Sequence, residues 1–239
     1  FVFTNHPVVR YIKLNITQGA GDFGSGRELY VFKVPGSASY TPGDINNDGR
    51  IDNNDLTSYT NYTGLRKGDG DFEGYISNGD INKNGLIDAY DISNVATQLE
   101  GGVHIDSAAA PSGKITVTAN KKAYKKDEVI EIKVSGAQLA NVNALSFALP
   151  YNQQDYEYIG VQPVGTKQME NLTYDRLHTN GSKALYPTFV NIGEQPQLTG
   201  TAYLFILKFK AKRNVIFSLK AVEGMLVSKT LEVTFEQAL

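Results

Sequence analysis

Apolar and polar residues alternate in a succession of short runs from residue 114 to near the end of the chain, with turn residues between the runs. The clearest run covers residues 203–210, in which four apolar side chains should point to one side and two lysines should face water. These are Tyr203, Phe205, Leu207 and Phe209 on the apolar side, and Lys208 and Lys210 on the other. The pattern predicts an antiparallel β-sandwich over residues 112–236.

The first 35 residues carry the same alternation in two runs, 8–17 and 28–34, with a glycine-rich turn between them. Two strands cannot form a stable core by themselves. We therefore expect this pair either to close a sandwich whose other strands precede it or to pack on the segments that follow.

Residues 41–101 show helical periodicity instead. Ile92, Val95, Ala96 and Leu99 follow the i, i+3, i+4, i+7 spacing, which predicts a helix over 91–99 with one buried face. An earlier helix is expected over residues 55–65.

Segments rich in proline, glycine and small residues, 35–42 and 102–113, are predicted linkers. They divide the chain into three predicted units: 1–35, 41–101 and 112–236. The predicted fold is therefore mostly β, with a small helical module between two β segments.

Two twelve-residue stretches of the helical module repeat one another: DINNDGRIDNND at 44–55 and DINKNGLIDAYD at 80–91. Both place oxygen-bearing groups at positions one, three, five, seven, nine and twelve, with glycine at six, as an EF-hand-type calcium loop does. The predicted ligands of the first loop are Asp44, Asn46, Asp48, the Arg50 carbonyl, Asp52 and Asp55. Those of the second loop are Asp80, Asn82, Asn84, the Leu86 carbonyl, Asp88 and Asp91.

Calcium is the predicted ion because all these ligands are hard oxygens and the chain has no cysteine. The first loop carries four carboxylates and the second three, so we expect the first to bind more tightly. A third loop could run from residue 69 to residue 80, but Asp80 would then have to close one loop and open the next. A solvated turn is the favoured interpretation of that stretch.

The asparagine at position three, the aspartate at position twelve and the helix after each loop resemble a type I dockerin. This resemblance implies a cohesin as the partner, contacted through positions ten and eleven of each loop. Those positions hold Asn53 and Asn54 in the first repeat, and Ala89 and Tyr90 in the second. Because the two pairs are chemically unlike, we expect one preferred docking face. An insertion, residues 66–79, separates the repeats more widely than the family pattern requires.

The last segment resembles a cohesin in the phrases VNALSFALPYNQQDYEYIGVQPVG, ENLTYDRL and GTAYLFILKFKAK, taken in that order. Pro150 and residues 152–154 depart from the usual turn of that family. The N-terminal wording RYIKLNITQGAGDFGSGRELYVFKVPG resembles the closing strands of an F5/8 type C (discoidin-like) domain. Together these resemblances imply the C-terminal region of a bacterial extracellular glycoside hydrolase.

Composition excludes several other classes of function. A formal net charge of −2 gives no electrostatic reason for nucleic-acid binding, and no run of eighteen apolar residues predicts a membrane span. Calcium loops are typical of proteins outside the cell or on its surface, where free calcium is high.

Catalysis by this region is not expected, because glycosidic hydrolysis needs two carboxylates flanking a cleft. The carboxylates not assigned to calcium are expected on the surface, and the histidines look isolated. The carboxylates are Asp155, Glu157, Asp175 and Glu223, and the histidines are His6, His104 and His178.

The predicted function is calcium-stabilised cohesin–dockerin assembly, either within one chain or between chains. The alternative is a carbohydrate-binding module that stacks sugars on exposed tyrosines. Its candidate residues are Tyr151, Tyr156, Tyr158, Tyr174 and Tyr186.

Overall fold

The computed structural model describes residues 41–72, 76–99 and 109–236. The predicted N-terminal strand pair lies outside these residues, as do His6 and His104. No helix in the described ranges has both the length and the apolar character needed to cross a membrane.

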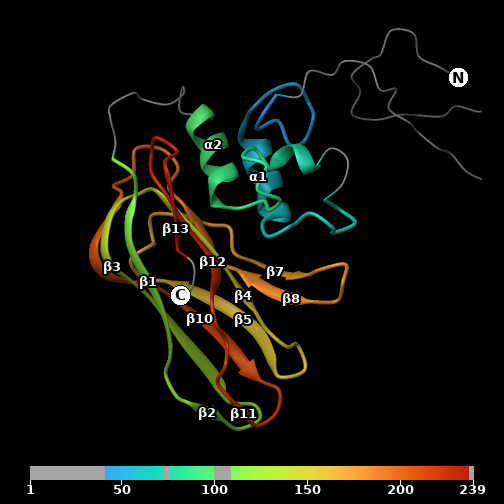
Figure 1. Ribbon diagram of the computed structural model, residues 1–239, viewed down its shortest axis with the longest axis vertical. Coiled ribbons are helices and arrows are strands. Elements are labelled where there is room, and N and C mark those ends of the chain that lie inside the picture. The colour runs from blue at the N-terminus through green and yellow to red at the C-terminus, as the bar shows by residue number, and fades with distance from the viewer. Residues whose placement is uncertain (1–40, 73–75, 100–108, 237–239) are drawn as a thin grey trace, which may run out of the picture. The chain divides into compact units, whose positions relative to one another are not determined.

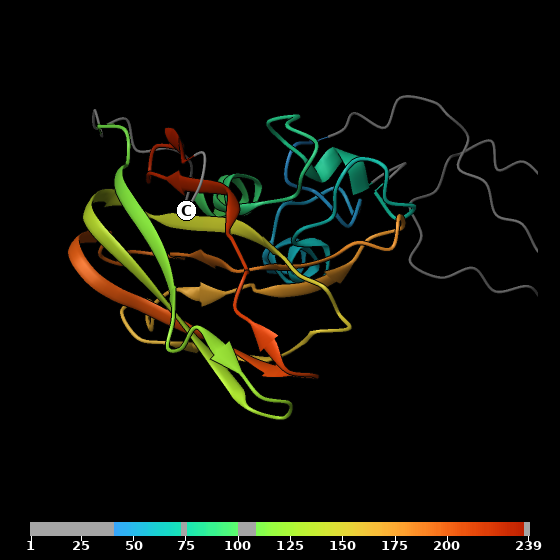
Figure 2. The ribbon, with the colours of Figure 1, turned by 60° about the horizontal axis from the view of Figure 1, so that its bottom comes forward.

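Two antiparallel sheets form the sandwich (Figures 1 and 2). The first has four strands in the order β1-β3-β10-β5. Their bounds are β1 Ser112–Ala119, β3 Val129–Val142, β10 Leu198–Ala211 and β5 Tyr156–Pro163. A separate two-stranded sheet pairs β2 Ala123–Tyr124 with β11 Val215–Ile216. In the sequence, β2 lies between β1 and β3, and β11 follows β10.

The second sheet has seven strands, with the main order β13-β12-β4-β8-β7 and with β9 and β6 branching from β4. Their bounds are β4 Ala144–Pro150, β6 Glu170–Asn171, β7 Tyr174–Leu177, β8 Lys183–Tyr186, β9 Thr188–Val190, β12 Val222–Val227 and β13 Val233–Glu236. The predicted mostly-β antiparallel fold is confirmed.

The inner faces of the two sheets meet in one apolar core. Phe205 of β10 stacks on Phe189 of β9, with ring centroids 4.5 Å apart, and on Phe147 of β4, at 6.2 Å. These contacts cross from one sheet to the other, as burial of alternate residues on facing sheets requires.

The predicted alternation in residues 203–210 is wrong at its first residue. Tyr203 is 60% exposed, whereas Phe205, Leu207 and Phe209 are buried. The register of β10 against β3 shifts between Tyr203 and Phe205, and this bulge turns Leu204 into the core in place of Tyr203. A one-residue bulge cannot be read from alternation alone.

Two helices and a short 3-10 helix make up the rest: α1 Asn53–Tyr62, η2 Ile76–Gly79 and α2 Ala89–Leu99. Both α-helices begin two residues earlier than predicted. In α1, Asp52 caps the helix and Asp55 bonds back to the backbone N–H of Asp52, so the loop's ninth position is already the helix cap.

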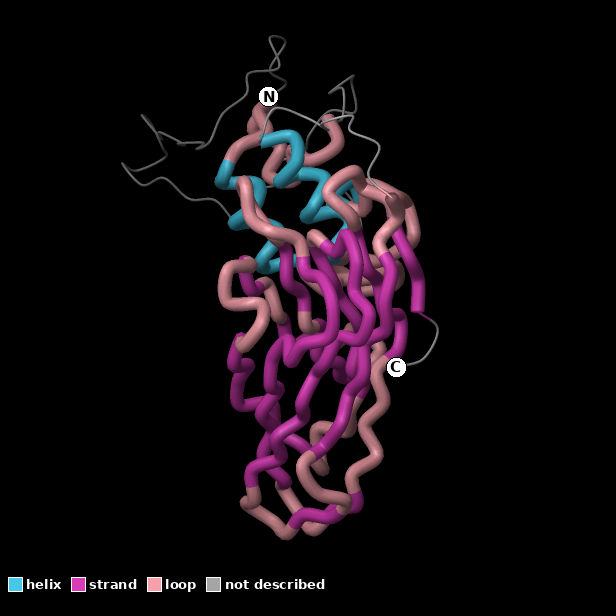
Figure 3. Tube along the Cα trace, turned by 90° about the vertical axis from the view of Figure 1, so that its left-hand side faces the viewer, coloured by secondary structure: helices cyan, strands magenta, loops and turns pink. Residues whose placement is uncertain are grey.

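Both helices gather at one end of the strands, as Figure 3 shows. Helix α2 contacts β4, β9 and β12, and α1 packs on α2. The described residues from 41 to 236 belong to one compact unit. One buried cluster joins the helical module to the sandwich, because Ile87, Ile92 and Val95 pack with Val190 and Val227 in it.

Candidate calcium loops and docking interface

The first loop is held by its own aspartates. Asp44 accepts backbone N–H bonds from Asp48 through Oδ1 and from Gly49 through Oδ2, both at 3.0 Å. Asn46 Oδ1 also accepts from the Asp48 N–H, at 2.9 Å, and Asp48 Oδ1 accepts from the Arg50 N–H, at 3.0 Å. Gly49 has φ +87°, the left-handed conformation that the sharp turn at position six requires.

Position twelve closes this loop. Asp55 Oδ2 accepts from the Asp52 N–H at 2.9 Å, and its Oδ1 accepts from the Asn46 N–H at 3.3 Å. The carboxylate in the first turn of α1 therefore reaches back to the third position. Asp55 is fully buried, and this burial raises its pKa.

The second loop repeats this network residue for residue in its first half. Asp80 accepts from the N–H groups of Asn84 and Gly85, at 3.0 and 2.9 Å. Asn82 Oδ1 accepts from the Asn84 N–H at 3.1 Å, and Gly85 has φ +86°. Two stretches with the same spacing therefore fold into the same turn.

The closure of the second loop differs by one residue. Asp91 Oδ2 accepts from the Asp88 N–H at 2.9 Å, and its Oδ1 accepts from the Ile81 N–H at 2.7 Å, so it reaches the second position instead of the third. Asn84 Nδ2 donates to Asp88 Oδ2 at 2.8 Å, across the space between the loop's side chains.

Burial disfavours the charged form of two carboxylates in the second loop, Asp88 and Asp91. It raises the pKa of Asp88 to about 6, and the pKa of Asp91 is raised well above its usual value by burial and by the charge of Asp88. Among the described residues, no lysine, arginine or histidine forms an ion pair with either carboxylate. A divalent cation would supply the missing positive charge.

The two loops supply the oxygen ligands that a calcium ion prefers, but their carboxylates do not converge on one point. In the described part of the chain, no three Asp, Glu, His or Cys side chains converge as a metal-binding group. The loop carboxylates accept backbone N–H bonds instead, and Asn side chains and backbone carbonyls supply the other predicted ligands. The twelve ligand residues remain a prediction.

The position of Asp69 contradicts both interpretations of the stretch that it begins, the third calcium loop and the solvated turn. Its side chain is 7% exposed, and its Oδ2 accepts from the Arg66 N–H at 3.1 Å and contacts His178 Nδ1 at 2.8 Å. Its Oδ1 accepts from the Thr179 N–H at 3.1 Å. Both oxygens of Asp80 are already used in the second loop, and residues 73–75 lie outside the described ranges.

His178 is not isolated, contrary to the sequence-based expectation. It joins Asp69 of the helical module to Tyr186 of β8, whose hydroxyl lies 2.8 Å from His178 Nε2. Arg66 donates to the same hydroxyl. Burial alone would raise the pKa of Asp69, but the hydrogen bonds from His178 and from two backbone N–H groups outweigh burial and lower it.

A second polar contact caps α1. Arg176 of β7 donates from Nη2 to the Asn61 carbonyl at 2.7 Å and from Nε to the Thr63 carbonyl at 3.0 Å. Carbonyls at a helix C-terminus have no partner within the helix and attract positive charge, so this arginine satisfies both needs. Its guanidinium also lies over the Tyr174 ring, 4.2 Å from the centroid.

The predicted partner-binding positions lie in different surroundings in the two repeats. Ala89 is fully buried and its N–H donates to Ser146 Oγ of β4 at 3.3 Å, while Tyr90 is half-buried. Asn53 and Asn54, the corresponding residues of the first repeat, are exposed. The second repeat faces the sandwich of its own chain.

The tyrosines proposed for sugar stacking serve mainly in packing. Tyr151, Tyr156 and Tyr186 are buried, and Tyr174 is covered by Arg176. Tyr158 packs edge-on against Phe209. Buried ring faces cannot stack on a sugar.

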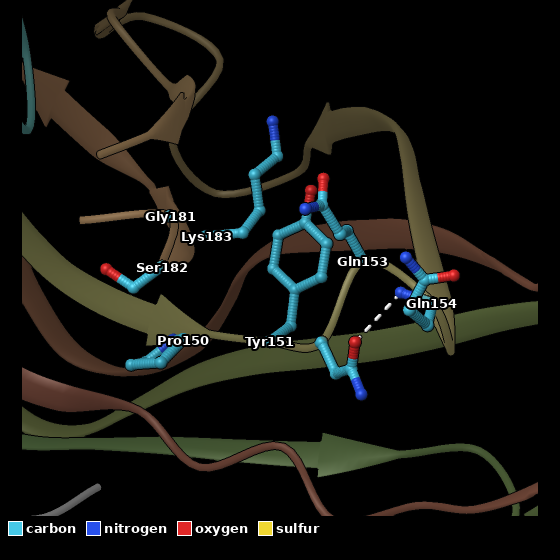
Figure 4. A pocket seen from close by; sticks show the side chains of 8 residues that line it. Pro150, Tyr151, Gln153, Gln154, Gly181, Ser182 and Lys183 are labelled. Carbon is cyan, nitrogen blue, oxygen red and sulfur yellow. Dashed lines mark hydrogen bonds between the residues drawn. The ribbon is translucent and has the colours of Figure 1, made fainter. Parts of the chain in front are cut away.

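A shallow pocket lies near one of these tyrosines (Figure 4). It is lined by the last residue of β4 and the loop after it, and by the turn before β8 and the first residue of β8, namely Pro150, Tyr151, Asn152, Gln153, Gln154, Gly181, Ser182 and Lys183. Asn152 Oδ1 accepts the Gln154 N–H at 2.9 Å, which fixes the loop. The side chains of Asn152, Gln153 and Gln154 are exposed, and the hydroxyl of the buried Tyr151 already donates to Asp175 Oδ1 at 2.7 Å.

Fold and contacts together define a two-loop helical module docked on an antiparallel β-sandwich. Residues 42–100 match the family described as dockerin type I domain. Type I dockerin domains generally bind calcium. No curated protein matches the chain.

Solved structures similar to this chain include cohesins, of which three are described here. A cohesin module of a family 33 glycoside hydrolase from Clostridium perfringens is 10% identical, with a TM-score of 0.42, over 55% of this chain and 93% of its own. A type II cohesin from the cellulosome of Acetivibrio cellulolyticus is 9% identical, with a TM-score of 0.42, over 53% and 90%. A type I cohesin–dockerin complex from Clostridium thermocellum gives 12% identity and a TM-score of 0.39 over 53% and 90%.

Proposed function

We propose that residues 41–236 are a non-catalytic assembly unit in which the dockerin segment, residues 42–100, binds the cohesin-like sandwich of the same chain. Calcium stabilises the unit, and the parent protein is a bacterial extracellular polysaccharide-degrading enzyme. The observation that carries this proposal is the buried face shared by α2 and the second sheet.

The apolar part of this face is continuous. Ala89, Ile92 and Val95 of α2 are fully buried, and on the sandwich side Val190 and Val227 are fully buried as well. Burying one such valine or isoleucine contributes about 1.5–3 kcal/mol. Without the dockerin segment, the outer side of the second sheet would expose an apolar patch of the kind that marks a binding site.

Calcium enters this proposal through α2. Asp91 lies in the first turn of α2 and also closes the second loop, so an ion held there would fix the start of the helix that docks. Asp80, Asp88 and Asp91, with the oxygens of Asn82, Asn84 and Leu86, would hold it. The equivalent set in the first loop would fix α1 in the same way. Binding energy of this kind becomes folding energy for a small module.

A non-catalytic role agrees with how the remaining carboxylates are used. Asp175 accepts the Tyr151 hydroxyl at 2.7 Å and pairs with Lys183 at 2.9 Å. Asp155 pairs with Arg213, and Glu223 pairs with Arg66. These groups support packing between neighbouring elements.

The test is to cut the chain between the two parts. A protease site introduced within residues 101–107 is cleaved after folding, and the product is run on gel filtration with calcium and with a chelator. We expect the two fragments to elute together in calcium and apart in chelator. Separation in calcium as well would overturn the proposal.

Light scattering on the uncut chain tests whether docking occurs within one chain. A monomer at every concentration is expected. A molar mass that rises with concentration would show that the dockerin segment of one chain binds the sandwich of another. The same two surfaces would then meet between chains and not within one chain.

A further inference from the structure

We infer that the insertion between the calcium loops makes this dockerin segment selective for its own sandwich, with Asp69 and His178 as the specificity-determining pair. This inference rests on the proposed docking and names its partner. The contact in question, the connector–hairpin contact, comprises Arg66, Asp69 and Gly70 on the insertion side and His178, Thr179 and Tyr186 on the sandwich side.

The start of the insertion is held in place by the second loop. Lys67 donates its N–H to the Gly85 carbonyl and Ile87 donates to the Leu65 carbonyl, both at 2.9 Å, and Arg66 forms a bridge with Leu86. The Asp69 N–H then donates to the Arg66 carbonyl at 2.9 Å, which closes a tight turn. Asp69 is therefore fixed by the module's own backbone before it contacts the sandwich.

The sandwich offers a matching set of groups between β7 and β8. His178 N–H donates to the Ser182 carbonyl at 2.8 Å, so the turn that carries the imidazole is itself fixed. Thr179 contributes twice: its N–H donates to Asp69 Oδ1 at 3.1 Å, and its Oγ1 accepts the Gly70 N–H at 2.8 Å. The hydrogen bonds between the insertion and the sandwich therefore use both side-chain and backbone groups.

Because the contact between Asp69 and His178 is buried, it disfavours binding to sandwiches that lack matching hydrogen-bond donors. The side chains of Asp69 and His178 are 7% and 2% exposed. A sandwich without donors at these two positions would leave Oδ1 of the buried Asp69 carboxylate unpaired and Oδ2 with only the Arg66 N–H of its own module, which is costly, whereas this sandwich supplies a donor to each oxygen. Specificity of this kind comes from the penalty imposed on the wrong partner.

Tyr186 extends the contact to the rest of the module. Its hydroxyl bonds His178 Nε2 and accepts from Arg66, and Leu86 of the second loop packs against the apolar cluster that Tyr186 forms with two alanines of the sandwich. Gly64 permits the approach, since a Cβ there would lie 2.2 Å from the ring. The insertion, the loop and the hairpin therefore fit one another at several linked points.

The first measurement is the release rate of the dockerin fragment from the cut chain in calcium. Asp69→Asn keeps the size of the side chain and removes its charge, and we expect release at least about 30-fold faster, since it weakens two hydrogen bonds from the sandwich to a buried carboxylate and a hydrogen bond to a charged group contributes about 1.5–3 kcal/mol. Asp71→Asn is the matched control, because Asp71 is exposed two residues further on, and we expect less than about a threefold change. Tyr186→Phe is a milder second variant, with release about five- to tenfold faster. Equal rates for the Asp69 and Asp71 variants would overturn the inference.

The second measurement tests selectivity directly. Cut Asp69→Asn chains and cut His178→Gln chains are mixed, separated briefly with chelator, returned to calcium and weighed by native mass spectrometry. We expect the unaltered dockerin fragment of one to pair with the unaltered sandwich fragment of the other. Random pairing overturns the inference while leaving the docking itself intact, whereas fragments of the original chain that separate in calcium overturn the proposed function.

Discussion

Replacing Gly64 by alanine should disrupt the docked unit through a single added methyl group. Gly64 has φ +78°, and its N–H donates to the Ile87 carbonyl at 2.9 Å, so the backbone is held in this conformation. A Cβ at this position would lie 2.2 Å from Cδ2 and 2.4 Å from Cγ of Tyr186. Real Cβ atoms do not approach other heavy atoms so closely, and the buried ring must therefore move.

The cost has two parts. The left-handed backbone conformation costs an alanine about 1–2 kcal/mol. Moving Tyr186 breaks the hydrogen bond between its hydroxyl and His178 Nε2, and leaving a buried polar group unpaired costs about 1–3 kcal/mol. The expected loss in the free energy of unfolding is therefore about 2–5 kcal/mol.

Gly200→Ala is the matched control. Gly200 has φ +77°, and no atom lies within 4 Å of the position its Cβ would take, so only the backbone cost of about 1–2 kcal/mol applies. For a chain of this size, 1 kcal/mol corresponds to about 2–4 °C in Tm. Thermal unfolding in calcium should therefore place the Tm of Gly64→Ala about 2–12 °C below that of Gly200→Ala. Equal Tm values for the two variants would refute the close contact between Gly64 and Tyr186.

Three further predictions concern the ion, the helix face and pH. Chelation should lower both Tm and helix content, because the buried carboxylates Asp88 and Asp91 would lose their counter-charge; unchanged values would contradict a structural role for calcium. Ser93 is buried on α2 and its hydroxyl has no hydrogen-bond partner in the described structure. Ser93→Ala should therefore leave Tm unchanged or raise it slightly, whereas Ser93→Arg should separate the cut fragments on gel filtration; a marked fall in Tm for Ser93→Ala would show that the hydroxyl is bonded. Because hydrogen bonds lower the pKa of Asp69 in the folded state, its contribution to stability is present above the unfolded pKa and is lost as pH falls through the lower folded pKa. Equilibrium unfolding between pH 3 and 5 should therefore show a smaller acid-induced loss in Asp69→Asn, and identical pH profiles would exclude this role.

The loops could be predicted from the sequence because their geometry is set by local spacing. Asp44 and Asp80 bond the residues four and five positions ahead, and such contacts repeat wherever the spacing repeats. The position-twelve aspartates also bond within their own loops: each accepts the N–H of position nine, and then Asp55 accepts from Asn46 whereas Asp91 accepts from Ile81. The helix starts were misplaced by two residues because the ninth position serves as both loop residue and cap.

The docking contacts could not be predicted in this way. Asp69 and His178 are separated by more than a hundred residues, and neither belongs to a periodic pattern. His178 looked isolated because its partners come from a different part of the chain, and Tyr203 looked buried because a bulge leaves no local trace. Contacts of this kind depend on how two finished surfaces meet.

The shared core of α2 and the second sheet has a consequence for the order of folding. During synthesis, α2 is made long before β12, the strand on which it finally packs. The part of its apolar face that β12 covers must therefore stay exposed until nearly the whole sandwich has emerged, and pairing so distant in sequence is slow to form. Early calcium binding would shorten the search, since a loop closed around the ion would keep the helix ready for the last strands.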